Sequence, residues 1–368
     1  MKNLKKAAKR IRKAIDNKEN IVLYSDSDLD GVVSLIILKE AIEKKGGISI
    51  QYTSNRKKWG YGISREAVLF MQKEAPALLI SMDCGISNFE GADVAKELGF
   101  ELMIIDHHKP LSKMPDASLI VDPMQKGDKS KFKRLANAGI VYKLAEEMLG
   151  ERFIEKKRRF LELASIATIA DMVPKEEDNK RILDEGLPYL ENPSIPSLRK
   201  LKKESKEKFM GDVVSLLNIT KPKKDVNDAY LFLLEEKEER IVKKINQLKK
   251  EKEKRKEKLA KEEEKILKKV NEDDIIVFEK GDFPSDFAGS LASKIIRKTK
   301  KPVFLYVIEN EMASGSVRMV PEHDAVEAMN YCRKILYSFG GHKEAAGFMV
   351  EKKNIEKFKE KLIEYFTN

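Results

Sequence analysis

Cysteine, histidine and tryptophan are scarce in this chain of 368 residues, which has two cysteines, four histidines and one tryptophan. The cysteines, Cys84 and Cys332, lie far apart, so they predict neither a disulfide framework nor a cysteine-based zinc site. We therefore expect a reducing, cytoplasmic location. Long apolar runs are also missing, and no stretch approaches the roughly 20 residues of a membrane-spanning helix. The sequence predicts no membrane contact.

Charge, in contrast, is abundant and unbalanced. Lysine and arginine number 72 against 61 aspartates and glutamates, which gives a formal net charge of +11 and a pI near 9.2. Such an excess favours an anionic partner such as nucleic acid. A heat-adapted chain rich in Lys and Glu would carry the same charge as solvated surface. Composition alone leaves both interpretations open.

The first half of the chain alternates short apolar segments with helical ones. The apolar segments are residues 20–25, 48–54, 76–83, 101–106 and 117–123. Fully apolar strands that alternate with helices predict an α/β fold, with a parallel sheet covered by helices on both faces. In such sheets a ligand binds at the carboxyl ends of the strands.

Acidic residues gather where these segments end. The sequences "YSDSDLDG", "SMDCGIS", "IIDHHKP" and "ASIATIADMVP" contribute Asp26, Asp28, Asp30, Asp83, Asp106 and Asp171. A lone aspartate in such a place usually caps a helix or a turn, but four segments of this kind are hard to explain as caps. Carboxylates that converge at one sheet edge repel one another unless cations lie between them. The pattern predicts a metal centre.

The histidine pair in "IIDHHKP", His107 and His108, indicates which metal and which chemistry. Oxygen ligands with one or two imidazoles suit Mn²⁺, with Mg²⁺ as the alternative. Two such ions about 3.5 to 4 Å apart are the usual apparatus for hydrolysing a phosphoester. One histidine can ligate metal while its neighbour binds the phosphate or protonates the leaving oxygen, and Asp106 can orient a ring.

These motifs, in this order, resemble those of the DHH phosphoesterase superfamily, most closely the RecJ-like nucleases of archaea. The far end of the chain agrees, because "GGHKEAAGF" at 340–348, together with "FAGSLASKII" and "ASGSVRM", resembles the DHHA1 substrate-binding domain. The resemblance implies a parallel-sheet DHH domain joined by a long helical linker to a smaller α/β DHHA1 domain. The expected boundaries are 1–195, 196–273 and 274–368.

The resemblance also implies roles for individual residues. Five would ligate the two metal ions, with Asp26 as an additional candidate: Asp28, Asp30, Asp83, His107 and Asp171. His108 would contact the scissile phosphate with the support of Asp106. The nucleic acid would be held from the second domain by Arg318, Gly340, Gly341 and His342.

The segment between the domains is unusual. Residues 223–280 contain neither proline nor glycine, and residues 238–270 are nearly all helix formers, so we expect one helix of about 45 residues. Residues 249–258 include no apolar side chain. This part is either a solvated strut with Glu–Lys pairs or a surface that tracks nucleic acid, and the sequence leaves both open.

Three functions are consistent with these motifs. The first is a metal-dependent exonuclease on single-stranded DNA or RNA, acting in replication or repair with a replicative-helicase complex or a repair helicase as partner. The second is a phosphodiesterase for very short oligonucleotides or cyclic dinucleotides. The third is a replication scaffold with little catalysis, which missing ligands would reveal. Here every ligand position is filled, and the basic linker favours a polymer, so we expect the exonuclease.

Overall fold

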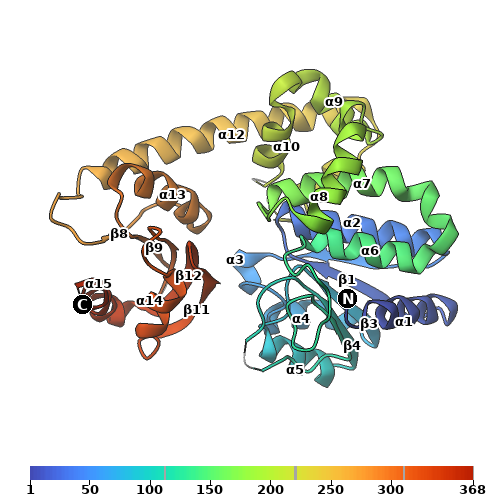
Figure 1. Cartoon of the computed structure of the whole chain (residues 1–368), viewed down its shortest axis with the longest axis horizontal. Helices are drawn as coiled ribbons and strands as arrows, with labels where there is room; N and C mark the ends of the chain where they lie inside the picture. Colours follow the sequence, from blue (N-terminus) through green and yellow to red (C-terminus); the bar gives the residue numbers. More distant parts are fainter. Residues whose placement is uncertain (112, 219–221, 310, 368) are drawn as a thin grey trace. The chain divides into compact units, whose positions relative to one another are not determined.

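The computed structural model describes residues 1–111, 113–218, 222–309 and 311–367. The chain divides into two compact units, Met1–Lys252 and Glu253–Asn368, called here the first and the second unit. Each unit has its own sheet and its own hydrophobic core. We describe them one at a time (Figure 1).

The first unit is built on a parallel sheet in the order β2-β1-β3-β4-β5. The predicted parallel sheet is therefore confirmed. The order reverses between β1 and β3, and such a switch point opens a crevice at the carboxyl ends of the strands. The strands are β1 (Ile21–Ser25), β2 (Ile50–Thr53), β3 (Ala77–Met82), β4 (Phe100–Ile105) and β5 (Leu119–Val121).

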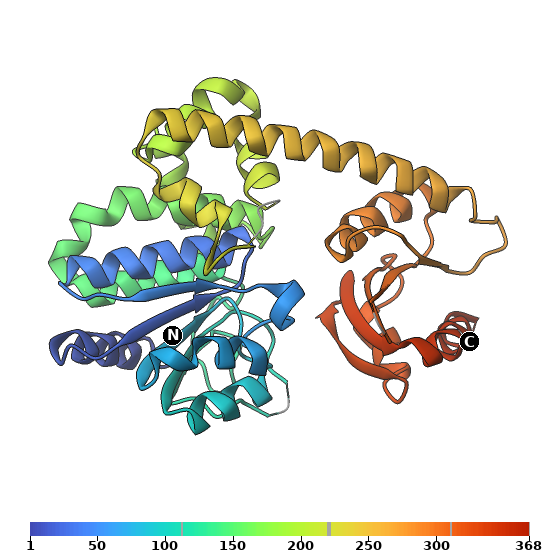
Figure 2. The same ribbon diagram turned by 180° about the vertical axis from the view of Figure 1, so that it is seen from behind.

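Helices cover both faces of this sheet. Alternate residues of β1 enter different cores: Leu23 packs in the larger core with α2 and α6, while Val22 packs in the smaller one with α4 and α5. Figures 1 and 2 show these two pairs of helices on opposite sides of the strands. Their bounds are α2 (Leu29–Lys44), α4 (Arg65–Met71), α5 (Phe89–Glu97) and α6 (Asn137–Leu149).

The larger core also recruits helices from both ends of the unit. Ile11 of α1 and Phe160 of α7 are fully buried in it. A two-stranded β6–β7 ladder and further helices complete the unit. The remaining elements are α1 (Leu4–Asp16), α3 (Arg56–Trp59), α7 (Ile154–Ala170), α8 (Glu177–Gly186), α9 (Pro196–Ser205), α10 (Phe209–Leu217), β6 (Pro222–Lys223), β7 (Val226–Asn227) and α11 (Asp228–Leu234).

The long helix α12 (Glu238–Leu267) has 30 residues and is about 45 Å long. It is shorter than the 45 residues expected. The backbone at Glu235 is extended, with ψ 132°, and this interrupts the helical segment before α12. The Glu235 carboxylate accepts hydrogen bonds from the backbone N–H groups of Glu236 (3.2 Å) and Lys237 (3.1 Å). These bonds hold the chain between α11 and α12 in place without proline or glycine.

The second unit is a smaller α/β domain, as predicted. Its sheet has the order β11-β12-β10-β9-β8, antiparallel except for the β8–β9 pair. Leu305 of β9 packs under α13, while its neighbour Phe304 packs with α14 and α15. The elements are β8 (Val277–Lys280), α13 (Ala288–Thr299), β9 (Val303–Glu309), β10 (Met312–Arg318), α14 (Ala325–Tyr331), β11 (Leu336–His342), β12 (Ala345–Glu351) and α15 (Ile355–Thr367).

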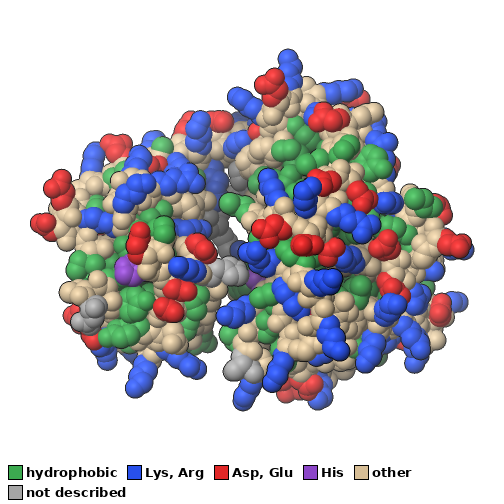
Figure 3. Space-filling model, in the orientation of Figure 1, with side chains coloured by type: hydrophobic (Ala, Val, Ile, Leu, Met, Phe, Trp, Pro, Cys, Tyr) green, Lys and Arg blue, Asp and Glu red, His purple; other side chains and the backbone are tan. Residues whose placement is uncertain are grey.

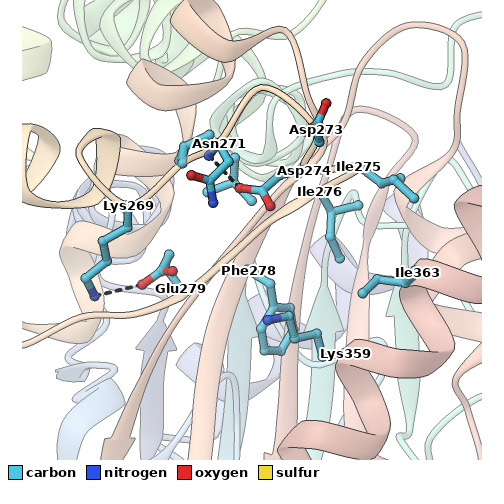
Figure 4. A pocket seen from close by; sticks show the side chains of 12 residues that line it. Lys269, Asn271, Asp273, Asp274, Ile275, Ile276, Phe278, Glu279, Lys359 and Ile363 are labelled. Carbon is cyan, nitrogen blue, oxygen red and sulfur yellow. Dashed lines mark hydrogen bonds and ion pairs between the residues drawn. The ribbon is translucent and has the colours of Figure 1, made fainter.

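A pocket of about 360 Å³ lies in the second unit beside β8, with Phe278 and Ile363 among its lining residues. Figure 4 shows charged side chains around it, and Lys269 pairs with Glu279 at 2.9 Å. Strand β8 is at the opposite edge of the sheet from β11. The pocket is therefore separate from the Gly340–Gly341 pair, which lies in β11.

The surface carries charge of both signs. Figure 3 shows Lys and Arg side chains interspersed with Asp and Glu over the visible face, so the net charge is not gathered into one patch there. Among the described residues, no helix has the length and apolar character that a membrane crossing would need.

Candidate metal centre

The loop from β1 into α2 carries the first three aspartates. Asp28 caps α2, and its carboxylate accepts a hydrogen bond from the Gly31 backbone N–H at 3.1 Å. A Cβ atom at position 31 would lie 2.5 Å from the carbonyl oxygen of Asp26, so only glycine permits this tight turn. The turn brings Asp26, Asp28 and Asp30 to the carboxyl end of β1.

Asp26 is buried and paired with a cation. Its carboxylate accepts a hydrogen bond from Ser54 Oγ at 2.7 Å and forms an ion pair with the Arg56 guanidinium. Burial alone would raise the pKa of Asp26, but Arg56 and Ser54 hold it below its ordinary value. Asp26 is thus already neutralised by the protein.

Asp30 is buried against the N-terminus of α6. Its two oxygens accept hydrogen bonds from the backbone N–H groups of Asn137 (2.7 Å) and Ala138 (2.8 Å). A helix N-terminus favours a negative charge. Burial, reinforced by the nearby Asp171, nevertheless raises the pKa of Asp30 to about 7. The charge on Asp30 therefore calls for a further cation.

Asp83, directly after β3, has the same need. Its backbone is left-handed, with φ 59°, a conformation that aspartate tolerates better than most residues. Its side chain is buried, and its pKa is raised well above the ordinary value by that burial and by the carboxylates of Asp28 and Asp30. Among the described residues, the ring of His107 is the one group that could carry a positive charge and pair with Asp83, and no lysine or arginine does so.

The histidine pair after β4 is held in two different ways. His107 Nδ1 lies 2.9 Å from the carbonyl oxygen of Leu135, so Nδ1 carries the proton, and the lone pair of Nε2 in the neutral ring is left to ligate a metal ion. Nε2 lies 3.2 Å from Asp83 Oδ1 and 4.0 Å from Asp30 Oδ2. Burial would lower the pKa of His107, but Asp30 and Asp171 raise it above its ordinary value.

His108 points its ring at Asp106. Its Nδ1 lies 2.7 Å from Asp106 Oδ1, and the same carboxylate accepts hydrogen bonds from the backbone N–H groups of His107, His108 and Ile86. Although burial opposes it, this hydrogen bonding from His108 holds the pKa of Asp106 below its ordinary value. Asp106 is satisfied by the protein and fixes His108, as a positioning residue does.

Asp171 comes from a helix end. It is the residue that follows α7, and its Oδ2 lies 3.8 Å from His107 Nδ1. It therefore reaches the same edge of the sheet from above the strands. All the acidic residues predicted from the sequence, with both histidines, meet at this edge.

Three overlapping groups of these side chains could each hold an ion, their ligand atoms lying within 4.8 Å of one another. Two of the groups share His107, and two share Asp83. The oxygen-rich donor set with imidazole suits Mn²⁺ or Mg²⁺, and the raised pKa values of Asp30 and Asp83 show charge that cations would compensate. The groups are Asp30–His107–Asp171, Asp83–His107–His108 and Asp26–Asp28–Asp83.

The sequence analysis missed several residues that support this centre. Ser54 and Arg56 fix Asp26, and Asn137, oriented to satisfy its neighbours, accepts from the Asp83 backbone N–H at 3.0 Å and donates to the Ile105 carbonyl at 3.1 Å. Asp122, after β5, is also buried, and burial raises its pKa to about 7. Only Asp122 had a visible signal, because "IVDP" is another strand that ends in aspartate.

The residues predicted to bind substrate lie in the second unit. Arg318 ends β10, and its Nε donates to Ser293 Oγ at 2.9 Å. Gly341 has φ 152°, and a Cβ there would lie 2.3 Å from the Ala345 carbonyl oxygen, whereas Gly340 has open space. His342 lies in β11, but its side chain is outside the described residues.

Comparison with known proteins agrees with this geometry. Residues 20–170 match the DHH family, N-terminal domain, and residues 272–368 match the DHHA1 domain. The chain therefore contains a DHH domain followed by a DHHA1 domain, and it is homologous to the RecJ exonucleases.

The similarity to RecJ extends over the whole chain. The single-stranded-DNA-specific exonuclease RecJ of Bacillus subtilis is 33% identical over 100% of this chain and 48% of that protein. RecJ of Thermus thermophilus is 26% identical over 99% of this chain and 54% of that protein. A crystal structure of exonuclease RecJ bound to manganese superposes with a TM-score of 0.83 at 25% identity, over 100% of this chain and 95% of that one. The chain thus spans about half the length of these curated relatives.

Proposed function

We propose that this protein is a two-metal exonuclease that hydrolyses phosphodiester bonds of single-stranded nucleic acid. The observation that carries the proposal is the convergence of buried carboxylates and His107 at one sheet edge, with the pKa values of Asp30 and Asp83 raised. Acidic groups held this way are typical of a cation site. The relatives named for single-stranded DNA support DNA as the polymer.

The proposed ligands are Asp28, Asp30, Asp83, His107 and Asp171, with Asp26 as an additional candidate. When bound, Mn²⁺ or Mg²⁺ would activate a water molecule and neutralise charge on the phosphate. The bond from His107 Nδ1 to Leu135 leaves Nε2 free to act as a ligand. Because Arg56 already neutralises Asp26, Asp26 is the weakest of the candidate ligands.

His108 is the proposed catalytic residue outside the ligand set. Its Nδ1 lies 2.7 Å from Asp106 Oδ1. Burial lowers the pKa of His108, but the hydrogen bond with Asp106 and the charge of that carboxylate raise it above its ordinary value. The ring therefore favours the protonated form, with Nε2 directed away from Asp106. Such a ring can bind a phosphate oxygen or give a proton to the leaving oxygen.

The second unit supplies the proposed substrate-binding residues Arg318, Gly340, Gly341 and His342. In this proposal residues 1–195 are the catalytic domain, 196–273 the helical linker and 274–368 the substrate-binding domain. A planar guanidinium suits phosphate, and a strand with two adjacent glycines lets a sugar-phosphate backbone approach closely.

The biological setting is also a proposal. An exonuclease on single strands fits DNA replication or repair, with a replicative-helicase complex or a repair helicase as the proposed protein partner. A non-catalytic scaffold is disfavoured because all five proposed ligand positions are occupied by ligating residue types. The alternative, a phosphodiesterase for very short oligonucleotides or cyclic dinucleotides, differs from our proposal in its substrate and shares the metal-dependent chemistry.

Digestion of end-labelled single-stranded 30-mers of DNA and RNA tests the proposal. We expect a ladder that grows from one end with Mn²⁺, a slower one with Mg²⁺, and no products in chelator. Cleavage in chelator would exclude the two-metal chemistry. Intact 30-mers beside cleaved dinucleotides would favour the short-oligonucleotide phosphodiesterase instead.

A further inference from the structure

The loop between β1 and α2, which carries Asp28, is braced by a segment from much later in the chain. Asn227 Nδ2 donates a hydrogen bond to the carbonyl oxygen of Ser27 at 2.7 Å, although the two residues are 200 positions apart. Asn218 Oδ1 accepts from the Leu29 backbone N–H at 3.1 Å, across 189 positions. The backbone is therefore held on both sides of Asp28.

Asn227 is fully buried and uses both ends of its side-chain amide. Its Oδ1 caps α11 by accepting a hydrogen bond from the Tyr230 backbone N–H at 2.9 Å. Serine, threonine or aspartate can supply such a cap as well as asparagine does, but none of them combines the capping oxygen with an N–H donor. Asparagine at this position is thus explained by its bond to Ser27.

The β6–β7 ladder also reaches the end of strand β2. The Asp225 carbonyl oxygen accepts from the Thr53 backbone N–H at 2.8 Å, and Thr53 is the last residue of β2. The next residue, Ser54, donates a hydrogen bond from its hydroxyl to Asp26. The segment before α11 therefore contacts two of the segments that build the metal centre.

Asp28 depends on this bracing more than Asp30 does. Asp30 is buried, and its carboxylate accepts hydrogen bonds from two backbone N–H groups of α6. The Asp28 side chain is 46% exposed, and its carboxylate accepts from Gly31 within its own turn. Burial therefore does not fix Asp28, and its place relative to Asp83 follows from the backbone of the loop.

We propose that Asn227 is a positioning residue of the metal centre, which with Asn218 holds the loop so that Asp28 reaches the ion. This inference rests on the proposed function and adds residues that support its ligands. Groups that orient a metal ligand from behind commonly change metal affinity by roughly 10- to 100-fold when they are removed. The buried bond from Asn227 to the loop is a support of this kind.

Four variants separate positioning from stability. Asn227→Ser keeps a capping oxygen for α11 but removes the donor to the loop. Asn218→Ala removes the acceptor, and Asn218→Asp restores one. Asn3→Ser is the matched control, because it also removes a side-chain N–H donor from a distant carbonyl, that of Ile120 at 2.9 Å, which lies outside the loop.

Calorimetric titration of Mn²⁺ into the whole protein, without nucleic acid, measures the effect directly. We expect Asn227→Ser to weaken Mn²⁺ binding about tenfold and Asn218→Ala about threefold. Asn218→Asp should recover the affinity of the unchanged protein to within about twofold, and Asn3→Ser should retain it even where urea unfolding shows a loss of stability. In digestion, excess Mn²⁺ should restore the rate of Asn227→Ser with KM for the strand unchanged, because the groups that contact the strand are untouched.

Two outcomes would overturn the inference. If Asn227→Ser binds Mn²⁺ as tightly as the unchanged protein, Asn227 only caps α11. If Asn3→Ser weakens Mn²⁺ binding to the same extent, the effect is general destabilisation. The proposed function fails separately: a protein that binds Mn²⁺, and loses affinity in Asn227→Ser, yet digests no strand would have the positioned metal centre without the exonuclease activity.

Discussion

The two sheets of this protein are built by opposite means. In the first, parallel sheet, strands buried on both faces end in aspartates, and the loops after them gather buried carboxylates such as Asp83. The second, mixed sheet instead has glycine and other small residues at paired positions, because Gly340 pairs with Gly347, and Gly347 pairs with Ser316. The first sheet therefore concentrates buried charge, and the second leaves its backbone open at Gly340.

We expect the largest effect on activity from a substitution at Asp83, a buried carboxylate at the edge of the first sheet. Asp83→Asn keeps the volume and the left-handed backbone, which asparagine tolerates, but removes the charge that ligates metal. We expect the rate of digestion to fall more than about a hundredfold. In chelator, the variant should melt no lower than the unchanged protein, because its burial no longer opposes an ionised group.

Thermal melting with and without Mn²⁺ provides a readout other than activity. The unchanged protein should be stabilised by Mn²⁺, and Asp83→Asn should lose most of that shift. Asp93→Asn, at an exposed position on α5, is the matched control and should behave like the unchanged protein. An Asp83→Asn variant with normal activity would remove Asp83 from the metal centre.

The open side of the comparison depends on two adjacent glycines that differ in their surroundings. A Cβ at Gly341 would meet the Ala345 carbonyl oxygen at 2.3 Å and Ala346 Cα at 2.5 Å, whereas a Cβ at Gly340 would meet nothing within 4 Å. We expect Gly341→Ala to lower the free energy of unfolding by about 3 kcal/mol through overpacking and backbone strain. Gly340→Ala should change it by less than about 0.5 kcal/mol.

Denaturant unfolding separates these variants, and activity then adds a second test. If Gly340→Ala is as stable as the unchanged protein yet digests a strand more weakly, the loss is at the substrate surface. Equal destabilisation by both changes would contradict the register of β11 and β12.

The sequence predicted the charged half of this comparison better than its supports. Strand ends are visible as apolar runs that stop at aspartate, so Asp26, Asp83 and Asp106 could be located directly. Arg56 and Asn137 could not, because their roles depend on α3 meeting Asp26 and on the N-terminus of α6 meeting Asp30 across more than 100 residues. Such contacts exist only after the sheet has formed.

The helix before the second unit shows a similar limit. Composition predicted a helical segment, which α12 confirms, but not its length, because the backbone is extended at Glu235, whose carboxylate accepts hydrogen bonds from two backbone N–H groups. Glutamate usually favours a helix interior, so propensity alone pointed the other way. Local side-chain to backbone bonding decided the boundary.

Asp128 is a carboxylate of the first unit whose pKa is lowered, whereas that of Asp83 is raised. Its carboxylate accepts from the Lys2 backbone N–H at 2.6 Å, from the Ser130 N–H at 2.7 Å and from Lys133 Nζ at 2.7 Å. Burial opposes ionisation, but Lys133 and these N–H groups hold the pKa of Asp128 well below its ordinary value. This carboxylate needs no added cation.

A folded-state pKa below the unfolded value of about 3.9 means that Asp128 stabilises the protein above that pH, and that this stabilisation is lost as the pH falls toward the lowered pKa. Asp128→Asn should therefore lower the free energy of unfolding by about 2 kcal/mol at pH 7. The deficit should shrink below about pH 3.9. Urea unfolding across pH measures it, with Asp184→Asn on exposed α8 as the control. A deficit that does not change with pH would show that ionisation is not its cause.

The smallest expected effect concerns the lysines of α12, some of which pair with acidic side chains of the first unit. Lys249 Nζ pairs with Glu204 at 2.7 Å, and Lys252 Nζ pairs with Asp212 at 2.9 Å and with Ser215 Oγ at 2.7 Å. Lysines already paired within the chain release few counterions from nucleic acid. These ion pairs therefore favour the solvated strut over a surface that tracks the strand.

Replacing five lysines with glutamine tests this directly: Lys249, Lys250, Lys252, Lys254 and Lys256. Each lysine that neutralises a phosphate contributes about 0.7 to the slope of log affinity against log salt for a single strand, and its replacement removes that contribution. Lys256 Nζ also pairs with Glu253, at 3.9 Å, so at most two of the five are available and we expect a total change below about 1.4 units. We also expect a stability loss of about 1 kcal/mol from the surface pairs. A variant with only Lys249→Gln and Lys252→Gln should show that stability loss and no change of slope. A slope reduced by about three units or more in the five-fold variant would make α12 part of the binding surface.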